Sequence, residues 1–217
     1  MNIICLANSR KNRHRCFAGK ESGTLRWVRP ICLMEDSAVS EQRMGLQDGS
    51  IPGLLDIIDV PLGEPHPFSF QPENYLIADG NWRKINVYNK SLIESLVDNP
   101  PDLWGGSSDR IVTSSLRNNP PSSSLYLIKP SSFRIFKSKF DGKLTACFEY
   151  NTFQYGLKVT DLKIESEFEK SRSGNYVFEN EQIYLCVSLG VPFQGFTDAE
   201  PCCYKLVASV IRIPLTI

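Results

Sequence analysis

The residues with the clearest capacity for binding chemistry lie between Cys5 and Pro30, in the stretch CLANSRKNRHRCFAGKESGTLRWVRP. A polar, basic turn separates two apolar runs there, and it offers hydroxyl, amide and guanidinium donors within a few residues. Guanidinium groups suit bidentate contacts to phosphate, and a tryptophan supplies a face on which a base can stack. The nucleic-acid contacts predicted in this stretch are Asn8, Ser9, Arg10, Lys11, Arg13, Arg15, Lys20, Trp27 and Arg29.

The positive charge of the chain is concentrated at this end. The whole sequence has 24 Lys and Arg against 24 Asp and Glu, so its formal net charge is +0. Residues 1–34 nevertheless hold seven Lys and Arg against one acid, a balance of +6 (7 − 1). This distribution indicates an anion-binding face of limited size. Two alternatives stay open, because nearby acids can neutralise such a surface and Trp27 can be a core residue of its strand.

A second candidate set lies in SFQPENYLIADGNW, where Asn74 and Trp82 are the predicted nucleic-acid contacts. The turn before the apolar run places an amide at the start of a strand, where it can hydrogen-bond a base edge. The alternative for Asn74 is that its side chain caps its own turn.

Motifs for catalysis and metal binding are missing from the sequence. There is no GxxxxGK[ST], GxGxxG, HExxH or GxSxG, and the seven cysteines and two histidines include no CxxC pair. Cys16 has basic neighbours but no matching base for a catalytic thiol. We predict a protein that is not an enzyme and holds no cofactor or metal, with cysteines that serve as small buried hydrophobic groups.

The sequence also bears on location. No apolar run approaches the ~20 residues that a membrane-spanning helix needs. The N-terminal apolar run precedes its positive cluster, which is the reverse of a secretory signal. We therefore expect a cytoplasmic protein with no membrane partner.

Strand patterns dominate the chain and must position these residues. The strands expected in the first half cover residues 2–7, 16–20, 24–31, 54–62 and 73–78. One helix is predicted there, over 90–97, and it ends before Pro100 and Pro101. Further strand-like runs follow residue 124, and Asp141-Gly142 predicts a hairpin turn between two of them.

The domain organisation follows from a change of composition. Residues 99–124 are rich in Pro and Ser and form the expected irregular connector. Two sets of strands, each within about 100 residues, are what two small Greek-key barrels require. We predict an all-β protein with domains 1–115 and 116–217, the first carrying the basic hairpin. A single β-sandwich is the alternative.

Several strings also resemble a known family. They are CLANSRK, RCFAGKE and WVRPI near the start, LLDIIDVPL and QPENYLI in the middle, and LKVTD, LCVSLGVPF and CCYKLVASVI at the end. In this order they resemble the dual OB-containing domain proteins of bacteria. The resemblance implies two tandem OB-like barrels and nucleic-acid recognition in bacterial conflict or defence systems. It points to the same basic hairpin, with Cys16, Gly19 and Pro30 added, although His14 stands where the family often has glycine.

Three functions stay open on the sequence alone. The first is a non-catalytic nucleic-acid-binding protein that serves as the recognition component of a defence system. The second is an adaptor that docks onto an effector protein, which the acidic middle third of the chain favours. The third is a sensor or enzyme for a nucleotide-like small molecule, with residues 8–11 as a phosphate cradle.

Overall fold

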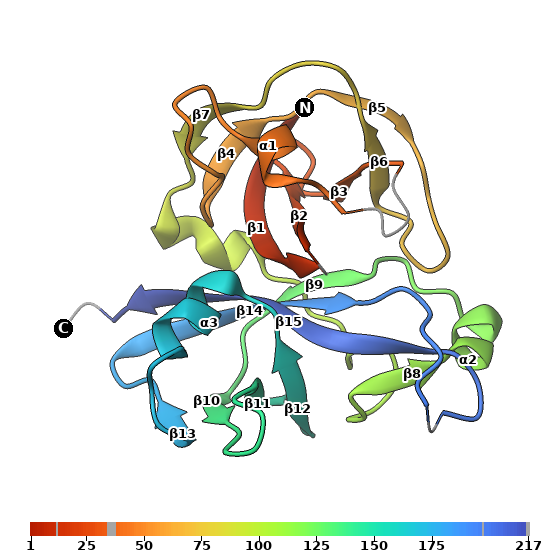
Figure 1. The fold of residues 1–217 in the computed structure, drawn as a ribbon, viewed down its shortest axis with the longest axis vertical. Coiled ribbons are helices and arrows are strands. Elements are labelled where there is room, and N and C mark those ends of the chain that lie inside the picture. The colour runs from red at the N-terminus through yellow and green to blue at the C-terminus, as the bar shows by residue number, and fades with distance from the viewer. Residues whose placement is uncertain (12, 34–37, 197, 216–217) are drawn as a thin grey trace. The chain divides into compact units, whose positions relative to one another are not determined.

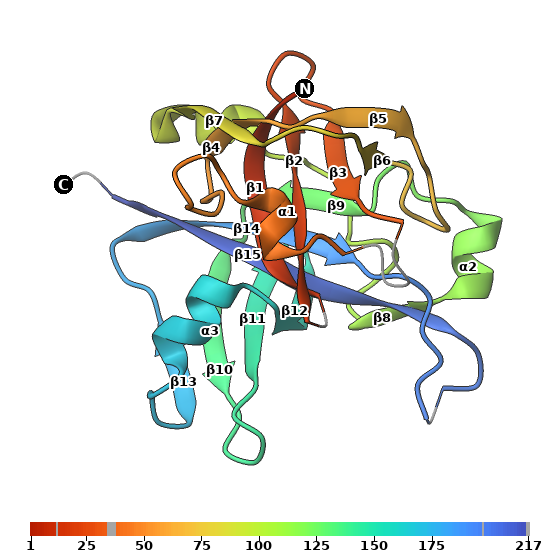
Figure 2. The same ribbon diagram turned by 45° about the horizontal axis from the view of Figure 1, so that its top comes forward.

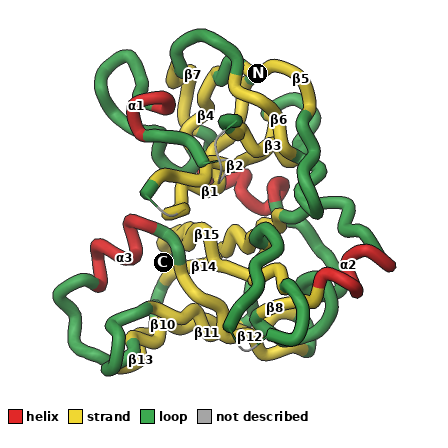
Figure 3. The backbone as a smooth tube through the Cα atoms, turned by 45° about the vertical axis from the view of Figure 1, so that its right-hand side comes forward, coloured by secondary structure: helices red, strands yellow, loops and turns green. Residues whose placement is uncertain are grey.

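The computed structural model describes residues 1–11, 13–33, 38–196 and 198–215, and the chain forms two compact units, Met1–Leu96 and Val97–Ile217. Strands are the main regular structure of both units and the helices are short (Figure 3). The all-β prediction is confirmed. Among the described residues, no helix has the length and apolar character that crossing a membrane would require.

The first unit is built on a curled seven-stranded sheet with the order β5-β6-β3-β2-β1-β4-β7 (Figure 1). Its strands are β1 (Asn2–Lys11), β2 (His14–Glu21), β3 (Trp27–Ile31), β4 (Asp56–Asp59), β5 (Leu62–Pro65), β6 (Asn74–Ile77) and β7 (Arg83–Val87). A short helix, α1 (Glu41–Met44), connects β3 towards β4, and a 3₁₀ helix, η1 (Lys90–Leu96), ends the unit. The helix predicted over 90–97 is therefore present in the tighter 3₁₀ form, which is common for short segments.

One interrupted strand closes this sheet into a barrel. β4 pairs with β1, and after a break at Pro61 the same segment continues as β5, which pairs with β6. Proline has no N–H for the ladder, but the Pro61 carbonyl accepts the Ala78 N–H at 3.0 Å. β3 and β6 pair in parallel and join the two parts of the sheet. The ring of strands therefore runs from β1 through β2, β3, β6 and β5–β4 back to β1.

The second unit repeats this connectivity. Its strands are β8 (Arg110–Val112), β9 (Leu125–Ile128), β10 (Ser132–Lys137), β11 (Leu144–Tyr150), β12 (Phe153–Val159), β13 (Gly174–Val177), β14 (Glu181–Leu189) and β15 (Cys202–Pro214). β10, β11 and β12 form an antiparallel meander, and β12 pairs with β15 in parallel. β13 pairs with β10 and β14 pairs with β15, so these two strands play the part of β4 and β5.

The helices fit the same scheme. Helix α3 (Leu162–Phe168) follows β12 as α1 follows β3, whereas α2 (Thr113–Asn118) belongs to the segment before the second barrel. Each unit is thus a five-stranded Greek-key barrel of the OB type with extra strands at its edges. The prediction of two tandem OB-like barrels is confirmed.

The barrel interiors follow from strand periodicity. Along β11 every second side chain is buried, as the two-residue repeat of a strand requires. Phe148 stacks on Tyr155 across the strands, with ring centroids 5.2 Å apart. In the first barrel the buried indole of Trp82 packs edge-on against Phe17 at 4.9 Å.

The connector belongs to the second unit, which changes the expected domain limits of 1–115 and 116–217. The Asp98 N–H donates to the Leu127 carbonyl at 2.7 Å, and the Asp98 carboxylate accepts the Leu127 N–H at 2.8 Å. β8 pairs with the start of β15. The chain therefore divides after Leu96, because residues 97–115 bond to strands far along the sequence that composition does not reveal.

Candidate nucleic-acid interface

The β1–β2 hairpin carries the predicted cations at its open end. Arg10 lies directly opposite Arg15, and Lys11 lies opposite His14. Arg10 and Arg13 are exposed, and Lys11 is partly exposed. The basic residues of this segment therefore lie together at the turn end of the hairpin.

Arg15 and its neighbours make contacts that attach the hairpin to the rest of the first unit. Arg15 Nη2 lies 2.6 Å from Glu41 Oε1, and its Nη1 donates to Asn8 Oδ1 at 3.4 Å. Asn8 donates its Nδ2 to the Pro52 carbonyl at 2.9 Å, and Ser9 is buried. The Asn8 amide and the Ser9 hydroxyl therefore face the protein. This corrects the expectation that residues 8–11 form a phosphate cradle.

Lys20 and Arg29 are interior residues, which corrects their assignment as nucleic-acid contacts. Lys20 is 4% exposed, and its ammonium donates to the Leu96 carbonyl at 2.8 Å and lies 5.3 Å from the centre of the half-buried Trp27 ring. Arg29 is 1% exposed, and its Nη1 lies 3.2 Å from Glu73 Oε1. A polymer on the surface has no access to either charge.

Asn74 and Trp82 are corrected in the same way. Asn74 is fully buried and its Nδ2 donates to Gln71 Oε1 at 3.4 Å, so the local-turn alternative describes it better than base recognition. Trp82 belongs to the core cluster of the first barrel. Its ring is a packing element there and offers no face to a ligand.

The outer face of the second barrel has a different character. The inner set of side chains, Ile135, Ala146 and Leu157, is buried, while the alternate positions face outward. The strands lie side by side with the β10–β11 turn at their lower end (Figure 2). The strand pairing places the outward side chains in rows, the first being Val177, Arg134, Cys147 and Gly156 and the second Asn175, Phe136, Thr145 and Lys158.

These rows combine an aromatic ring with cations. Phe136 is 39% exposed although it lies on a strand. Among the described residues, neither Arg134 nor Lys158 makes an ion pair or a side-chain hydrogen bond. A Cβ at Gly156 would meet only Thr145 Cγ2, at 3.8 Å, so the surface of the sheet is open at that point.

The β10–β11 turn, at the end of these strands, carries a second exposed ring. Phe140 is 89% exposed, and the Lys139 ammonium lies 5.0 Å from its ring centre. Lys143 pairs with Asp141 at 2.7 Å, and hydrogen bonds from Lys143 and Ser138 lower the pKa of Asp141 to about 2. We call the surface formed by Arg134, Phe136, Lys139, Phe140 and Lys158 the outer face patch.

The sequence contains a pattern that indicates this patch, but the pattern is not a cluster of charge. In SFRIFKSKFDGK the first residues alternate between apolar and basic, as Phe133, Arg134 and Ile135 show, and Lys139 and Lys143 lie on either side of the Asp141-Gly142 turn. Such alternation predicts one buried and one solvent-facing side, and two phenylalanines at outward or turn positions are unusual. The expected turn itself is confirmed, with Gly142 at φ 68° in the left-handed region.

The corresponding face of the first barrel is closed. Phe17 points into the core, so Ala18 and Lys20 are on the opposite side of β2, and both are buried. Of the two equivalent faces, the one on β11 and β12 therefore offers open aromatic and cationic groups.

In the described part of the chain, the cysteines and histidines form neither a metal site nor a disulfide. Among the described residues, no group of three or more His, Cys, Asp or Glu is placed to hold a metal ion. The cysteines are free thiols, and Cys5, Cys186, Cys202 and Cys203 are buried. Burial raises the pKa of the Cys203 thiol to about 11, so this thiol stays neutral at physiological pH.

Comparison with known proteins agrees with this architecture. Residues 1–210 match the family described as the dual OB-containing domain. No curated protein and no solved structure matches the chain. The match covers almost the whole sequence and requires two OB barrels, as found here, so the chain belongs to the dual OB-containing domain family.

Proposed function

We propose that this protein binds single-stranded nucleic acid on the outer face patch of its second barrel. The observation that carries the proposal is the exposure of Phe136 and Phe140 on one hairpin, beside cations that no described carboxylate neutralises. OB barrels in general bind oligonucleotides on the face of their second and third strands and on the adjoining loops. β11 and β12 are those strands in the second barrel.

The chemistry of the patch suits an unpaired strand. Bases with free faces stack on aromatic side chains, and each such contact contributes about 1–3 kcal/mol to binding. Phe136 and Lys158 are two strands apart, a span of about 10 Å at the usual strand spacing. A base on the ring can therefore keep its backbone within reach of a cation. A duplex hides its base faces and would leave both rings unused.

The end of the β1–β2 hairpin is proposed as an additional phosphate contact. Arg10, Lys11 and Arg13 sit there, beside Arg15, which pairs with Glu41. Contacts of this kind bind any sequence, because they reach phosphate and not bases.

We propose a protein that acts by binding and not by catalysis. The recognition role in bacterial defence that the family resemblance implies stays a prediction, as does a cytoplasmic location.

Fluorescence anisotropy with labelled single- and double-stranded oligonucleotides at two salt concentrations tests the proposal. We expect saturable binding of single strands that weakens at higher salt, because phosphate contacts release counterions. Flat titrations at low salt would overturn the proposal. So would equal affinity for single- and double-stranded oligonucleotides that does not change when residues of the outer face patch are substituted.

A second candidate function is docking to an effector protein. Phe193 is 60% exposed and Phe196 is fully exposed, both in the loop between β14 and β15. Exposed apolar rings on a loop fit a protein surface. Co-purification of an effector that survives nuclease treatment, and that fails for Phe193→Ser with Phe196→Ser, would support this role, whereas release by nuclease would exclude direct docking.

A further inference from the structure

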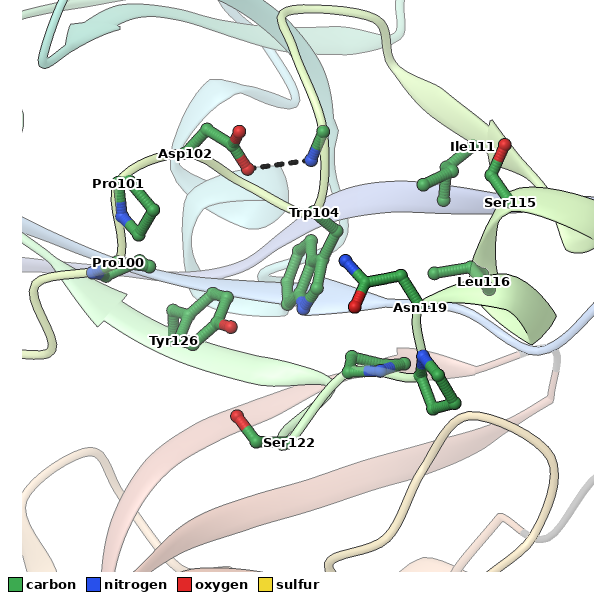
Figure 4. Close-up of a pocket in the computed structure, with 13 residues that line it drawn as sticks. Pro100, Pro101, Asp102, Trp104, Ile111, Ser115, Leu116, Asn119, Ser122 and Tyr126 are labelled. Atoms are coloured by element: carbon green, nitrogen blue, oxygen red, sulfur yellow. Dashed lines mark hydrogen bonds between the residues drawn. The ribbon is translucent and has the colours of Figure 1, made fainter.

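The second unit contains a pocket that is separate from the outer face patch. Its volume is about 600 Å³, within the range of small-molecule sites. Trp104 and Tyr126 form its centre, with Pro100 and Pro101 on one side (Figure 4). Pro120 and Pro121 also line it. The segment that forms it is the Pro-rich stretch that the sequence identified only as a connector.

The aromatic centre of the pocket is held in position before any ligand arrives. The rings of Trp104 and Tyr126 stack with centroids 4.8 Å apart, and the Trp104 indole N–H donates to the Ser123 carbonyl at 2.8 Å. Trp104 has a φ of 58°, in the left-handed region of backbone conformation that residues other than glycine rarely adopt. Such strain is retained where it positions a functional group.

Pro100 and Pro101, on one side of the pocket, are also held in place by hydrogen bonds. The Tyr150 hydroxyl donates to the Pro100 carbonyl at 2.7 Å, and Asn151 Nδ2 donates to the Pro101 carbonyl at 2.9 Å. Because both prolines also have restricted backbones, the pocket loses little conformational freedom on binding.

Two polar groups face this apolar surface with unused hydrogen-bonding capacity. The side chain of Asn119 points towards Trp104 and makes no hydrogen bond to another described residue (Figure 4). Asp102 accepts the Gly105 N–H at 2.7 Å on Oδ1, and its Oδ2 accepts none from the described residues. The site therefore offers one amide that donates and accepts and one carboxylate oxygen that accepts.

The described residues that line the pocket include no Lys, Arg or His. A phosphate group would find no counter-charge there, which excludes the phosphate end of a nucleotide. A cationic side chain of a protein has no acceptor for the Asn119 NH₂ group, so it would leave that donor unmatched. A nucleobase with an exocyclic amino group matches both, because asparagine pairs with adjacent donor and acceptor atoms of a base and a carboxylate accepts from the amino group.

We infer that this pocket binds a single unstacked nucleobase that carries an exocyclic amino group. The base lies against the aromatic and proline surfaces, with Asn119 and Asp102 on its polar edge. If the proposed function holds, this base belongs to the bound strand, and the pocket gives the protein a preference for base identity that stacking alone does not supply.

Ligand-observed NMR with free nucleosides tests the pocket without a nucleic-acid polymer. Each nucleoside is titrated to about 10 mM, which is enough to detect a Kd of about 1 mM. Adenosine and cytidine are expected to bind, and uridine is expected to bind more weakly. Asn119→Ala should weaken adenosine binding at least tenfold, by analogy with ~1–3 kcal/mol for a bidentate base contact. Asn118→Ala is the matched control, since Asn118 is exposed and does not line the pocket.

The outcomes separate this inference from the proposed function. No nucleoside signal on the wild type, or equal loss in both asparagine variants with unchanged melting temperatures, would overturn the pocket assignment. Binding of arginine amide in place of nucleosides would overturn it in favour of a protein ligand. Oligonucleotide binding without nucleoside binding would leave the outer face patch standing, and nucleoside binding without oligonucleotide binding would remove the patch alone.

Discussion

Phe136 and Lys158 lie in the same row of the second barrel's sheet, on the strands that flank Thr145. An exposed ring and a cation that pairs with no described carboxylate are thereby held about two strand spacings apart. In the proposed function, this arrangement would place a base on the ring and its phosphate at the cation.

Removal of the rings should weaken binding without unfolding the barrel. Phe136→Ala and Phe140→Ala should each cost about 1–3 kcal/mol of single-strand affinity, the usual contribution of a stacking contact. Anisotropy titrations measure the loss. Phe68→Ala is the control, because Phe68 is 50% exposed but lies in the first unit. Equal effects at all three positions would contradict a specific role for the second barrel.

Removal of the cations should change the salt dependence. Arg134→Gln and Lys158→Gln should each reduce the slope of log K against log salt by about 0.7, the value for one single-strand phosphate contact. Lys170→Gln is the matched control, since Lys170 is exposed outside the patch. A slope that stays constant in both patch variants would show that their charges do not contact phosphate.

Glu41 should limit the contribution of the first hairpin. Glu41→Gln removes the carboxylate that pairs with Arg15 at 2.6 Å and leaves the guanidinium available to phosphate. We expect tighter binding at low salt and a slope steeper by up to about 0.7. Affinity that is unchanged in this variant, and also in Arg10→Ala with Arg13→Ala, would exclude the hairpin from the interface.

Arg29 should matter for stability alone. Arg29→Ala leaves the Glu73 carboxylate buried without its cation, which typically costs about 3–5 kcal/mol. Urea denaturation measures this loss in the free energy of unfolding. The exposed Arg26→Ala should change stability by less than about 0.5 kcal/mol. A similar small effect at Arg29 would contradict its structural role.

Lys205 should give stability a dependence on alkaline pH. Burial lowers the pKa of Lys205 to about 8 from 10.5, while its ammonium donates to the Gly106 carbonyl at 2.9 Å. Between these pH values the unfolded chain binds more protons at this site than the folded chain, so the site's contribution to stability rises with pH. Urea denaturation at pH 7.5 and 9.5 should show wild type gaining relative to Lys205→Met. A stability difference that does not change with pH would contradict the lowered pKa.

The barrels could be predicted from the sequence because alternation of apolar residues specifies strands and their inner faces. β11 is the clearest case, since every second residue is buried as the pattern requires. The closing strand was harder, because 54–62 reads as one strand while Pro61 divides the pairing between β1 and β6. Partners far apart in the chain are not encoded in local periodicity, and the domain limit was misplaced for the same reason.

The site was predicted less well, because residue type does not reveal burial. Lys20 and Arg29 look like surface cations in the sequence, yet a backbone carbonyl and a carboxylate hold them in the interior. Trp82 was predicted to contact nucleic acid, although it packs on Phe17 in the core. Phe140 shows the opposite case, in which a phenylalanine that would be assigned to a core stands on a turn.

Amide chemical-shift mapping of the isotope-labelled protein with a short single-stranded oligonucleotide tests the central claim most directly. We expect saturable shifts centred on β10, β11, β12 and the β10–β11 turn, with weaker shifts at the end of the β1–β2 hairpin. Shifts confined to the first barrel, or no saturable shift at low salt, would contradict the assignment of the outer face patch as the binding surface.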